Sequence, residues 1–248
     1  MTKPTTRPPM DPTRKLALAA GLFYLVTFVG SLPALPLYHD ILTDPNHLLG
    51  SGSDTGVLWG AVLEMLCALG GIGSAIALYP VARRHSQTAA LGFVAARTLE
   101  ATMIFVGVAS VLSLVTLHDG GAAAADSGSL LMTGRGFVAL HDWSFLIGPG
   151  IMPAINAFCI GTVMYRTGLV PRILPKLGLL GAPLLLASTL ATLFGVYDQI
   201  SGWAVLGCLP IAAWELGFGL WLTFKGFRPA AVESLPASAP MDRIPVAV

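Results

Sequence analysis

Ionisable side chains inside apolar stretches are the residues of this chain best placed to do chemistry. They are Glu64, Arg97, Glu100 and Glu215. An ionisable residue at the centre of a membrane-spanning helix costs roughly 2.5–3.5 kcal/mol on insertion scales, so it usually faces the interior of a bundle and marks a functional site. A rise of about 1.5 Å per residue along a helix places all of them in one band of the membrane. We therefore expect them to face the interior of the bundle together.

Acidic groups outnumber basic ones in this set, which has a single guanidinium, that of Arg97. Complete ionisation would leave negative charge uncompensated at low dielectric, where desolvation and repulsion between like charges disfavour the charged form. We therefore expect at least one of Glu64, Glu100 and Glu215 to stay protonated near neutral pH. A protonated carboxyl group in an apolar cavity can act as a general acid or a proton carrier. The alternative is an ion-pair staple in which Arg97 holds Glu100, with no further role.

The stretch LHDWSFLIGPGIMP (residues 140–153) contains a second group of candidates. His141 and Asp142 could form an acid–base or ligand pair at the mouth of a cavity. The alternative is that Asp142 caps a helix and Trp143 is an interfacial residue. The glycines and prolines of this stretch should interrupt the helix, and such breaks often line cavities. The candidate acid–base residues are therefore Glu64, Glu100, Glu215, Asp142 and His141, and the candidate ligand-binding residues are Arg97, Asn156 and Trp143.

Motifs for metals and cofactors are absent from the sequence. The cysteines lie inside apolar runs with no zinc spacing: Cys67, Cys159 and Cys208. The histidines other than His141 fall in predicted loops or at the ends of spans: His39, His47, His85 and His118. The chain also contains no P-loop and no H-E-x-x-H motif. We therefore expect no metal and no cofactor.

The composition requires lipid as the solvent of most of this chain. Hydrophobic residues make up 54% of it and charged residues only 11%, with a mean hydropathy of +0.74. A soluble domain has about 25% charged residues, because it must cover its surface in water. The net charge of +1 gives no reason to expect a nucleic-acid partner. The lipid bilayer is therefore the one partner that the composition indicates.

Apolar stretches of spanning length predict an all-α, six-span transmembrane bundle, since a helix needs about 20 apolar residues to cross the membrane. The predicted spans are residues 16–37, 57–79, 89–117, 143–164, 177–196 and 203–224. The third is long, so it should tilt or protrude. Residues 129–140 could form a short interfacial helix before the fourth span. The spans belong to one membrane domain, 14–228, between tails 1–13 and 229–248 that we expect to be disordered.

The basic residues predict the orientation of the bundle. All but two of the 14 Lys and Arg residues lie before the first span or after the second, fourth or sixth. The exceptions are Arg97, inside the third span, and Arg135, in a loop on the other side. The positive-inside rule then places the N and C termini in the cytoplasm.

The chain resembles a family of bacterial membrane proteins grouped as domain of unknown function 4386. The similarity covers about Arg14 to Phe227 and is carried, in this order, by GLFYLVTFVGSLPAL, VLWGAVLEMLCALGGIGSAIALYPVARR, GFVAARTLEATMIFVGV, LHDWSFLIGPG, MYRTGLVPRILPKLGLLG and WELGFGLWLTFKGF. The resemblance implies a six-span fold and the polar set Glu64, Arg97, Glu100, His141, Asp142 and Glu215. It implies no activity. We expect the protein to be located in the bacterial inner membrane.

Three kinds of function fit these observations. The first is a multi-pass membrane protein whose buried Glu/Arg cluster forms a pocket for a lipophilic ligand. The second is an intramembrane acid–base enzyme, a cyclase or isomerase of an isoprenoid-like substrate, with Glu64 or Glu215 as the acid. The third is a proton-coupled carrier of small solutes. The sequence leaves open whether the protein is an enzyme and whether it has protein partners.

Overall fold

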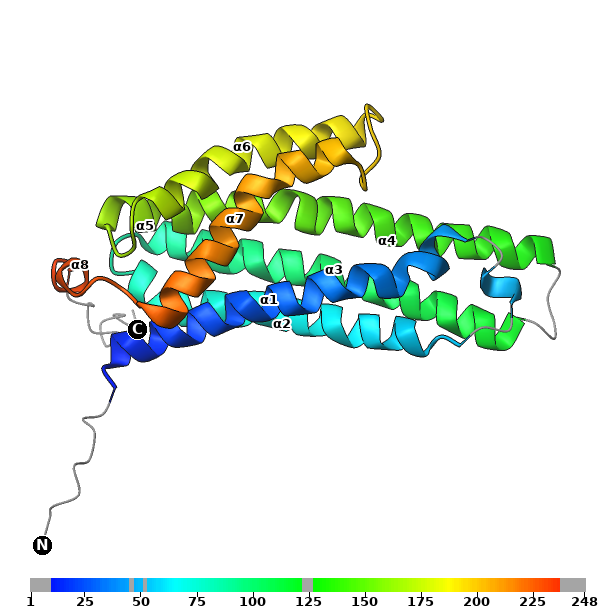
Figure 1. The fold of residues 1–248 in the computed structure, drawn as a ribbon, viewed down its shortest axis with the longest axis horizontal. Helices are drawn as coiled ribbons and strands as arrows, with labels where there is room; N and C mark the ends of the chain where they lie inside the picture. Colours follow the sequence, from blue (N-terminus) through cyan, green and yellow to red (C-terminus); the bar gives the residue numbers. More distant parts are fainter. Residues whose placement is uncertain (1–9, 45–46, 51–52, 122–126, 237–248) are drawn as a thin grey trace, which may run out of the picture.

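The computed structural model describes residues 10–44, 47–50, 53–121 and 127–236, and its regular elements in these ranges are all helices. Figure 1 shows their arrangement along the long axis of the molecule. The helices are α1 (Pro12–Thr43), the 3-10 helix η1 (His47–Leu49), α2 (Thr55–Ala82), α3 (Gln87–Gly121), α4 (Ser127–Asn156), the π-helix η2 (Ala157–Gly161), α5 (Thr162–Thr167), α6 (Ile173–Leu193), α7 (Gly202–Phe224) and α8 (Pro229–Glu233).

Within the described ranges, six helical stretches are long and apolar enough to cross a membrane. They are α1, α2, α3, the continuous run α4–η2–α5, α6 and α7. This confirms the predicted six-span helical fold. Most of the helices are longer than the apolar runs because they continue through flanking polar residues; α1, for example, begins beside Asp11, whose carboxylate accepts hydrogen bonds from the amides of Thr13 and Arg14.

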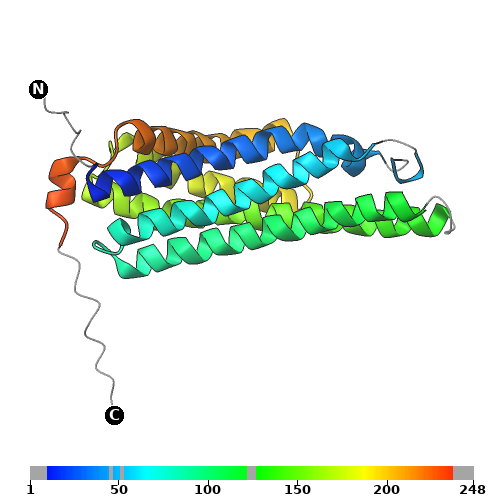
Figure 2. The ribbon, with the colours of Figure 1, turned by 90° about the horizontal axis from the view of Figure 1, so that it is seen from below.

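The helices follow one another around the bundle in chain order. Successive helices pack together, α4 packs on α6, and α7 returns to α1, which closes the ring. Figure 2 shows α1, α2 and α3 side by side along the long axis. Both ends of the described chain lie at one end of the bundle, which we call the terminal end; the other is the distal end. The helices α3 and α4 extend toward the distal end beyond the tip of the α6–α7 hairpin.

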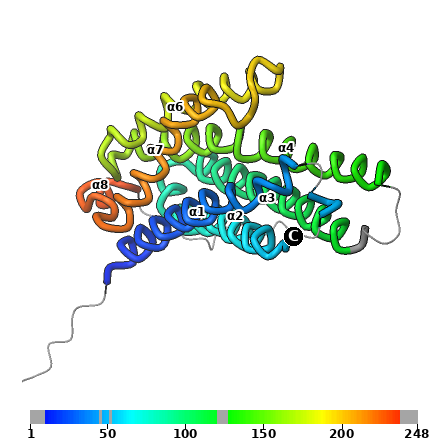
Figure 3. Tube along the Cα trace, turned by 45° about the vertical axis from the view of Figure 1, so that its right-hand side comes forward, coloured from blue at the N-terminus to red at the C-terminus, as the bar shows by residue number. Residues whose placement is uncertain are grey.

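Glycines allow α1 to approach its two neighbours closely. A Cβ atom on Gly21 would lie 2.5 Å from the backbone nitrogen of Thr223 in α7, and one on Gly30 would lie 2.9 Å from the backbone nitrogen of Cys67 in α2. Small residues of this kind are typical of helix contacts in membranes, where close packing replaces the hydrophobic effect. From the Gly21 contact, α1 and α7 diverge toward the distal end, as Figures 1 and 3 show.

The fourth span differs from the predicted one. The expected interfacial helix at residues 129–140 is continuous with the span, as part of α4. The helix also continues through Pro149 and Pro153, and loosens into the π-helix η2 only after Asn156. Neighbouring groups support the distorted backbone: the Thr189 hydroxyl of α6 donates a hydrogen bond of 2.7 Å to the carbonyl oxygen of Gly150.

The start of the predicted C-terminal tail is ordered against the bundle. It contains the short helix α8, and Leu235 packs into the core at the terminal end. The guanidinium of Arg84 donates hydrogen bonds to the carbonyl oxygens of Val232, Leu235 and Pro236. Apolar burial and these hydrogen bonds explain why the segment 229–236 departs from the predicted disorder; the rest of that tail, and residues 1–9, lie outside the described residues.

Candidate functional site

Arg97 is the centre of a buried polar network between the helices. Its side chain is almost fully buried, and it ion-pairs with two carboxylates. Nη1 donates to Oε2 of Glu100 at 3.0 Å, and Nη2 donates to Oε1 of Glu215 at 2.5 Å. The amide of Asn156 donates to the same Glu100 oxygen at 2.8 Å. The network therefore joins α3, α7 and the end of α4.

The geometry of the network follows from local helix structure. Arg97 and Glu100 are three residues apart on α3, a spacing that puts both side chains on one face. The guanidinium carbon of Arg97 lies 4.9 Å from the centre of the Tyr24 ring of α1, a cation–π contact that is strengthened by the low dielectric. Asn156 directly precedes the π-helix η2, and single π-helical turns are frequent at functional sites.

The network lines a cavity of about 280 Å³ between the helices. All six spans contribute to its walls, which are mainly apolar. Glu64, Arg97, Glu100 and Glu215 supply its ionisable groups. The sequence-based expectation that these residues face the interior together thus matches their positions in the fold.

Glu64 lies on the same cavity but outside the ion-pair network. It is buried, with 4% of its surface exposed, and its carboxyl group interacts electrostatically with Tyr38 and His141. No hydrogen bond of ordinary geometry reaches its Oε2 atom from the described residues. The Nε atom of Arg97 and the Oδ1 atom of Asn156 are likewise buried without a partner there. Buried polar atoms are normally hydrogen-bonded, so these groups could bind a polar part of a ligand.

The cavity opens to the lipid-facing surface between α1 and α7. Leu32 and Leu35 of α1 line it and are also 61% and 52% exposed on the surface of the protein. On the other side of the opening, Cys208 and Ala212 of α7 line it. Figure 3 shows the backbones of α1 and α7 diverging toward the distal end. Because the rim of the opening is apolar, the opening suits entry from the hydrocarbon part of a membrane.

Four of the predicted site residues are not among those that line this cavity: His141, Asp142, Trp143 and Asn156. The side chain of Asp142 is 58% exposed and contacts the ring of His141, at 3.2 Å between Oδ1 and Nδ1. Trp143 is 50% exposed on the outer surface of α4. Both residues lie in the middle of a continuous helix, so Asp142 is not the helix cap that its position suggested. His141 itself is buried and stacks on Phe145, which lines the cavity.

Sequence reasoning missed the contribution of α1. Tyr24 supports Arg97, while Thr27 and Ser31 line the cavity. The predicted span 16–37 contains no Asp, Glu, Lys, Arg or His, so sequence reasoning did not include it in a site. The available signal was the pair of hydroxyl residues four positions apart, which share one face of a helix.

One of three comparisons with known proteins found a match, to a protein family. The sequence profile of the family described as "Domain of unknown function (DUF4386)" matches residues 19–226. No curated protein and no solved structure matches the chain. The matched segment runs from α1 to just beyond the end of α7 and includes the whole Arg97 network. The chain therefore belongs to the family described as Domain of unknown function (DUF4386).

Proposed function

We propose that this protein binds an amphipathic lipophilic molecule in the cavity between its spans. The observation that carries the proposal is an apolar cavity that combines a buried Arg97 network with an apolar opening toward lipid. Ligand pockets typically pair apolar walls with a few polar groups that fix orientation. The polar group of the ligand would contact Glu64 and the Arg97 network, and its hydrocarbon part would extend between α1 and α7.

The charges of the cavity favour a hydroxyl or amine head group over a phosphate. Each terminal nitrogen of Arg97 already donates to a carboxylate, so the guanidinium has no free pair of terminal nitrogens for bidentate binding of an anion. Glu64 adds a further acidic group to the same cavity. An anionic head group would raise the negative charge in a medium of low dielectric, whereas a donor could pair with the free oxygen of Glu64. An isoprenoid alcohol is the ligand class that fits best.

Matched ligands test the head-group claim directly. Purified protein in detergent is titrated with geranylgeraniol and, separately, with geranylgeranyl monophosphate, and the midpoint of thermal unfolding is followed. A ligand that binds only the folded state raises this midpoint with its concentration. We expect the alcohol to raise it and the phosphate, which has the same chain, to have a much smaller effect. An equal or larger effect of the phosphate would contradict the proposal.

A second candidate is acid–base catalysis on such a ligand, and the position of Glu64 favours it. A carboxyl group in an apolar cavity, with Oε2 free of hydrogen bonds from the described residues, can supply a proton to an alkene. The Arg97 network on the same cavity would then stabilise the charge that develops. Mass spectrometry of geranylgeraniol after incubation would detect an isomerised or cyclised product, and the Glu64→Gln variant should form none. Unchanged alcohol with the wild-type protein would leave binding as the function.

The basic residues support a cytoplasmic terminal end in a bacterial inner membrane. Lys and Arg residues follow the ends of α2, α5 and α7 and lie in the first turn of α1, at the terminal end. The positive-inside rule places such loops in the cytoplasm. A reporter enzyme that works only in the cytoplasm should therefore be active when it is fused to the C-terminus. Activity of a fused reporter that works only in the periplasm would contradict this orientation.

A further inference from the structure

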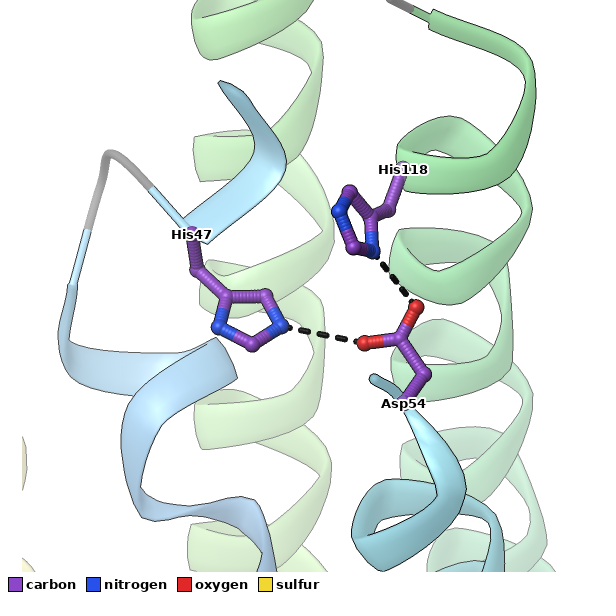
Figure 4. A group of neighbouring side chains, drawn as sticks. All are labelled: His47, Asp54 and His118. Atoms are coloured by element: carbon purple, nitrogen blue, oxygen red, sulfur yellow. Dashed lines mark hydrogen bonds and ion pairs between the residues drawn. The ribbon is translucent and has the colours of Figure 1, made fainter. Parts of the chain in front are cut away.

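Two histidines and an aspartate that are distant in the sequence meet at the distal end of the bundle. Figure 4 shows the carboxylate of Asp54 between the rings of His47 and His118. Asp54 Oδ1 lies 3.0 Å from Nε2 of His47, and Asp54 Oδ2 lies 2.6 Å from Nδ1 of His118. These groups belong to η1, the N-cap of α2 and the end of α3. They are separate from the Arg97 cavity, whose lining includes none of them.

The cluster is held in place by its surroundings. The side chains of His47, Asp54 and His118 are 16%, 7% and 8% exposed. Leu48, next to His47, is buried in an apolar cluster with Leu114 of α3, which fixes η1 against the helices. Asp54 occupies the N-cap position of α2, yet its side chain makes no capping hydrogen bond and turns to the histidines instead.

The hydrogen bonds of His118 cannot all be made by a neutral imidazole. Its Nε2 atom faces the carbonyl oxygen of Gly50 at 3.0 Å, and its Nδ1 atom faces the carboxylate of Asp54. Both neighbours are acceptors, whereas a neutral imidazole has only one N–H. With the proton on Nε2, the lone pair of Nδ1 points at a negative oxygen. A cation between Nδ1 and the carboxylate removes this conflict, and a second proton on the ring is the alternative.

We propose that His47, Asp54 and His118 bind a divalent transition-metal ion, with zinc as the best fit. The nearest ligand atoms of the three side chains lie within 4.8 Å of one another. Zinc bonds of about 2.0–2.2 Å to nitrogen and oxygen bring tetrahedral ligands to roughly 3.3 Å. Small rotations of the side chains can lengthen the contacts of 2.6 and 3.0 Å and shorten the larger separations to this value. Two imidazoles disfavour magnesium and calcium, which prefer oxygen ligands.

The second contact of His118 supports this assignment. A metal-binding histidine usually donates its other N–H to a carbonyl or carboxylate, which fixes the tautomer that coordinates the ion. The carbonyl oxygen of Gly50 occupies that place. Three protein ligands leave a fourth position for water. The ion would tie the connection between α1 and α2 to the end of α3, and so stabilise the distal end.

Metal content and stability of the full-length protein, purified without a histidine tag, test this proposal. The protein is stripped with a chelator, dialysed against zinc chloride and assayed for bound zinc and for its thermal midpoint. We expect stoichiometric zinc and a raised midpoint in the wild type, and loss of both effects in the His47→Gln/His118→Gln variant. His39→Gln, which changes an exposed histidine of α1, is the matched control and should bind zinc normally.

Cobalt replaces zinc in a second measurement, which does not depend on how well the variants fold. Cobalt bound to the wild type should give visible bands of a site with nitrogen and oxygen ligands. A thiolate charge-transfer band would instead assign the metal to a cysteine and overturn the proposal. Equal zinc binding by the double variant, or no binding by helical wild-type protein, would also overturn it. In the last case the cluster is a hydrogen-bonded clasp with a protonated histidine.

Discussion

At the scale of single residues, the carboxylates of the cavity divide into two kinds. Glu100 and Glu215 are paired with Arg97, so they hold helices together. Glu64 is as deeply buried but makes no hydrogen bond to the described residues through Oε2. Removing one partner of a buried ion pair leaves an uncompensated charge on the other partner. Neutralising a buried carboxylate that has no counterion instead removes the free-energy cost of its desolvation. The first kind is therefore structural and the second is free to act on a ligand.

Substitution by glutamine separates these roles. Glu100→Gln should lower the free energy of unfolding by about 3–5 kcal/mol, because Arg97 loses a buried counterion. Glu64→Gln should change it by less than about 0.5 kcal/mol, or raise it. Unfolding in detergent, followed by circular dichroism, measures both. Glu233→Gln, in the exposed helix α8, is the matched control. A Glu64→Gln variant as unstable as Glu100→Gln would show that Glu64 is structural too.

Some of these residue pairs could be predicted from the sequence and others could not. Arg97 and Glu100 are three positions apart, so helix geometry alone brings them together. The pairing of Arg97 with Glu215 depends on α7 packing against α1 and α6 in the ring of helices, which helical periodicity does not specify. His118 and Asp54 are 64 positions apart and lie at helix ends, where no periodic signal exists. The sequence-based expectation of no metal site rested on spacing along the chain, and spacing gives no information on side chains that folding brings together, such as His47, Asp54 and His118.

At the scale of helices, close contacts at glycine determine the shape of the cavity. The approach of α1 to α7 at Gly21 fixes the point from which the two helices diverge. A side chain at this position would push them apart, because the backbone of Thr223 cannot move away as a flexible side chain could. The apolar runs predicted these helices, but they gave no information on where two of them touch.

Alanine substitutions test this helix contact. Gly21→Ala should lower the free energy of unfolding by about 1–3 kcal/mol, the usual cost of overpacking. Gly136→Ala is the matched control, because no atom lies within 4 Å of the new Cβ on the exposed side of α4. It should raise the stability by up to about 1 kcal/mol through helix propensity. Thermal unfolding of both variants measures the difference, and equal effects would contradict the proposed role of Gly21.

The fourth span shows where pattern reasoning at this scale reaches its limit. Glycines and prolines at 148–153 predicted a break, yet α4 continues through them and loosens only at η2. Hydrogen bonds from neighbouring spans, such as that from Thr189 to Gly150, support the backbone there. Such support comes from tertiary packing, so a prediction made one span at a time cannot include it.

At the scale of the whole molecule, the ring of spans closes at the terminal end and opens toward lipid farther along. This arrangement would let a lipophilic molecule enter sideways from the bilayer and place its polar group near the Arg97 network. The proposed metal site at the distal end is separate from that cavity, so loss of either one should leave the other intact. The six spans could be predicted from composition and segment length, but the lateral opening could not, because it depends on the angle between α1 and α7.

The most direct test of the central claim is native mass spectrometry of protein taken from its own membrane. Ala212→Phe adds a ring inside the cavity, and Ala213→Phe adds the same ring to the exposed face of α7 one residue later. We predict that an isoprenoid-like lipid co-purifies with the wild-type protein and with the Ala213→Phe variant, and that the Ala212→Phe variant has lost it. Equal lipid retention by the two variants, or wild-type protein without bound lipid, would contradict the proposed binding site.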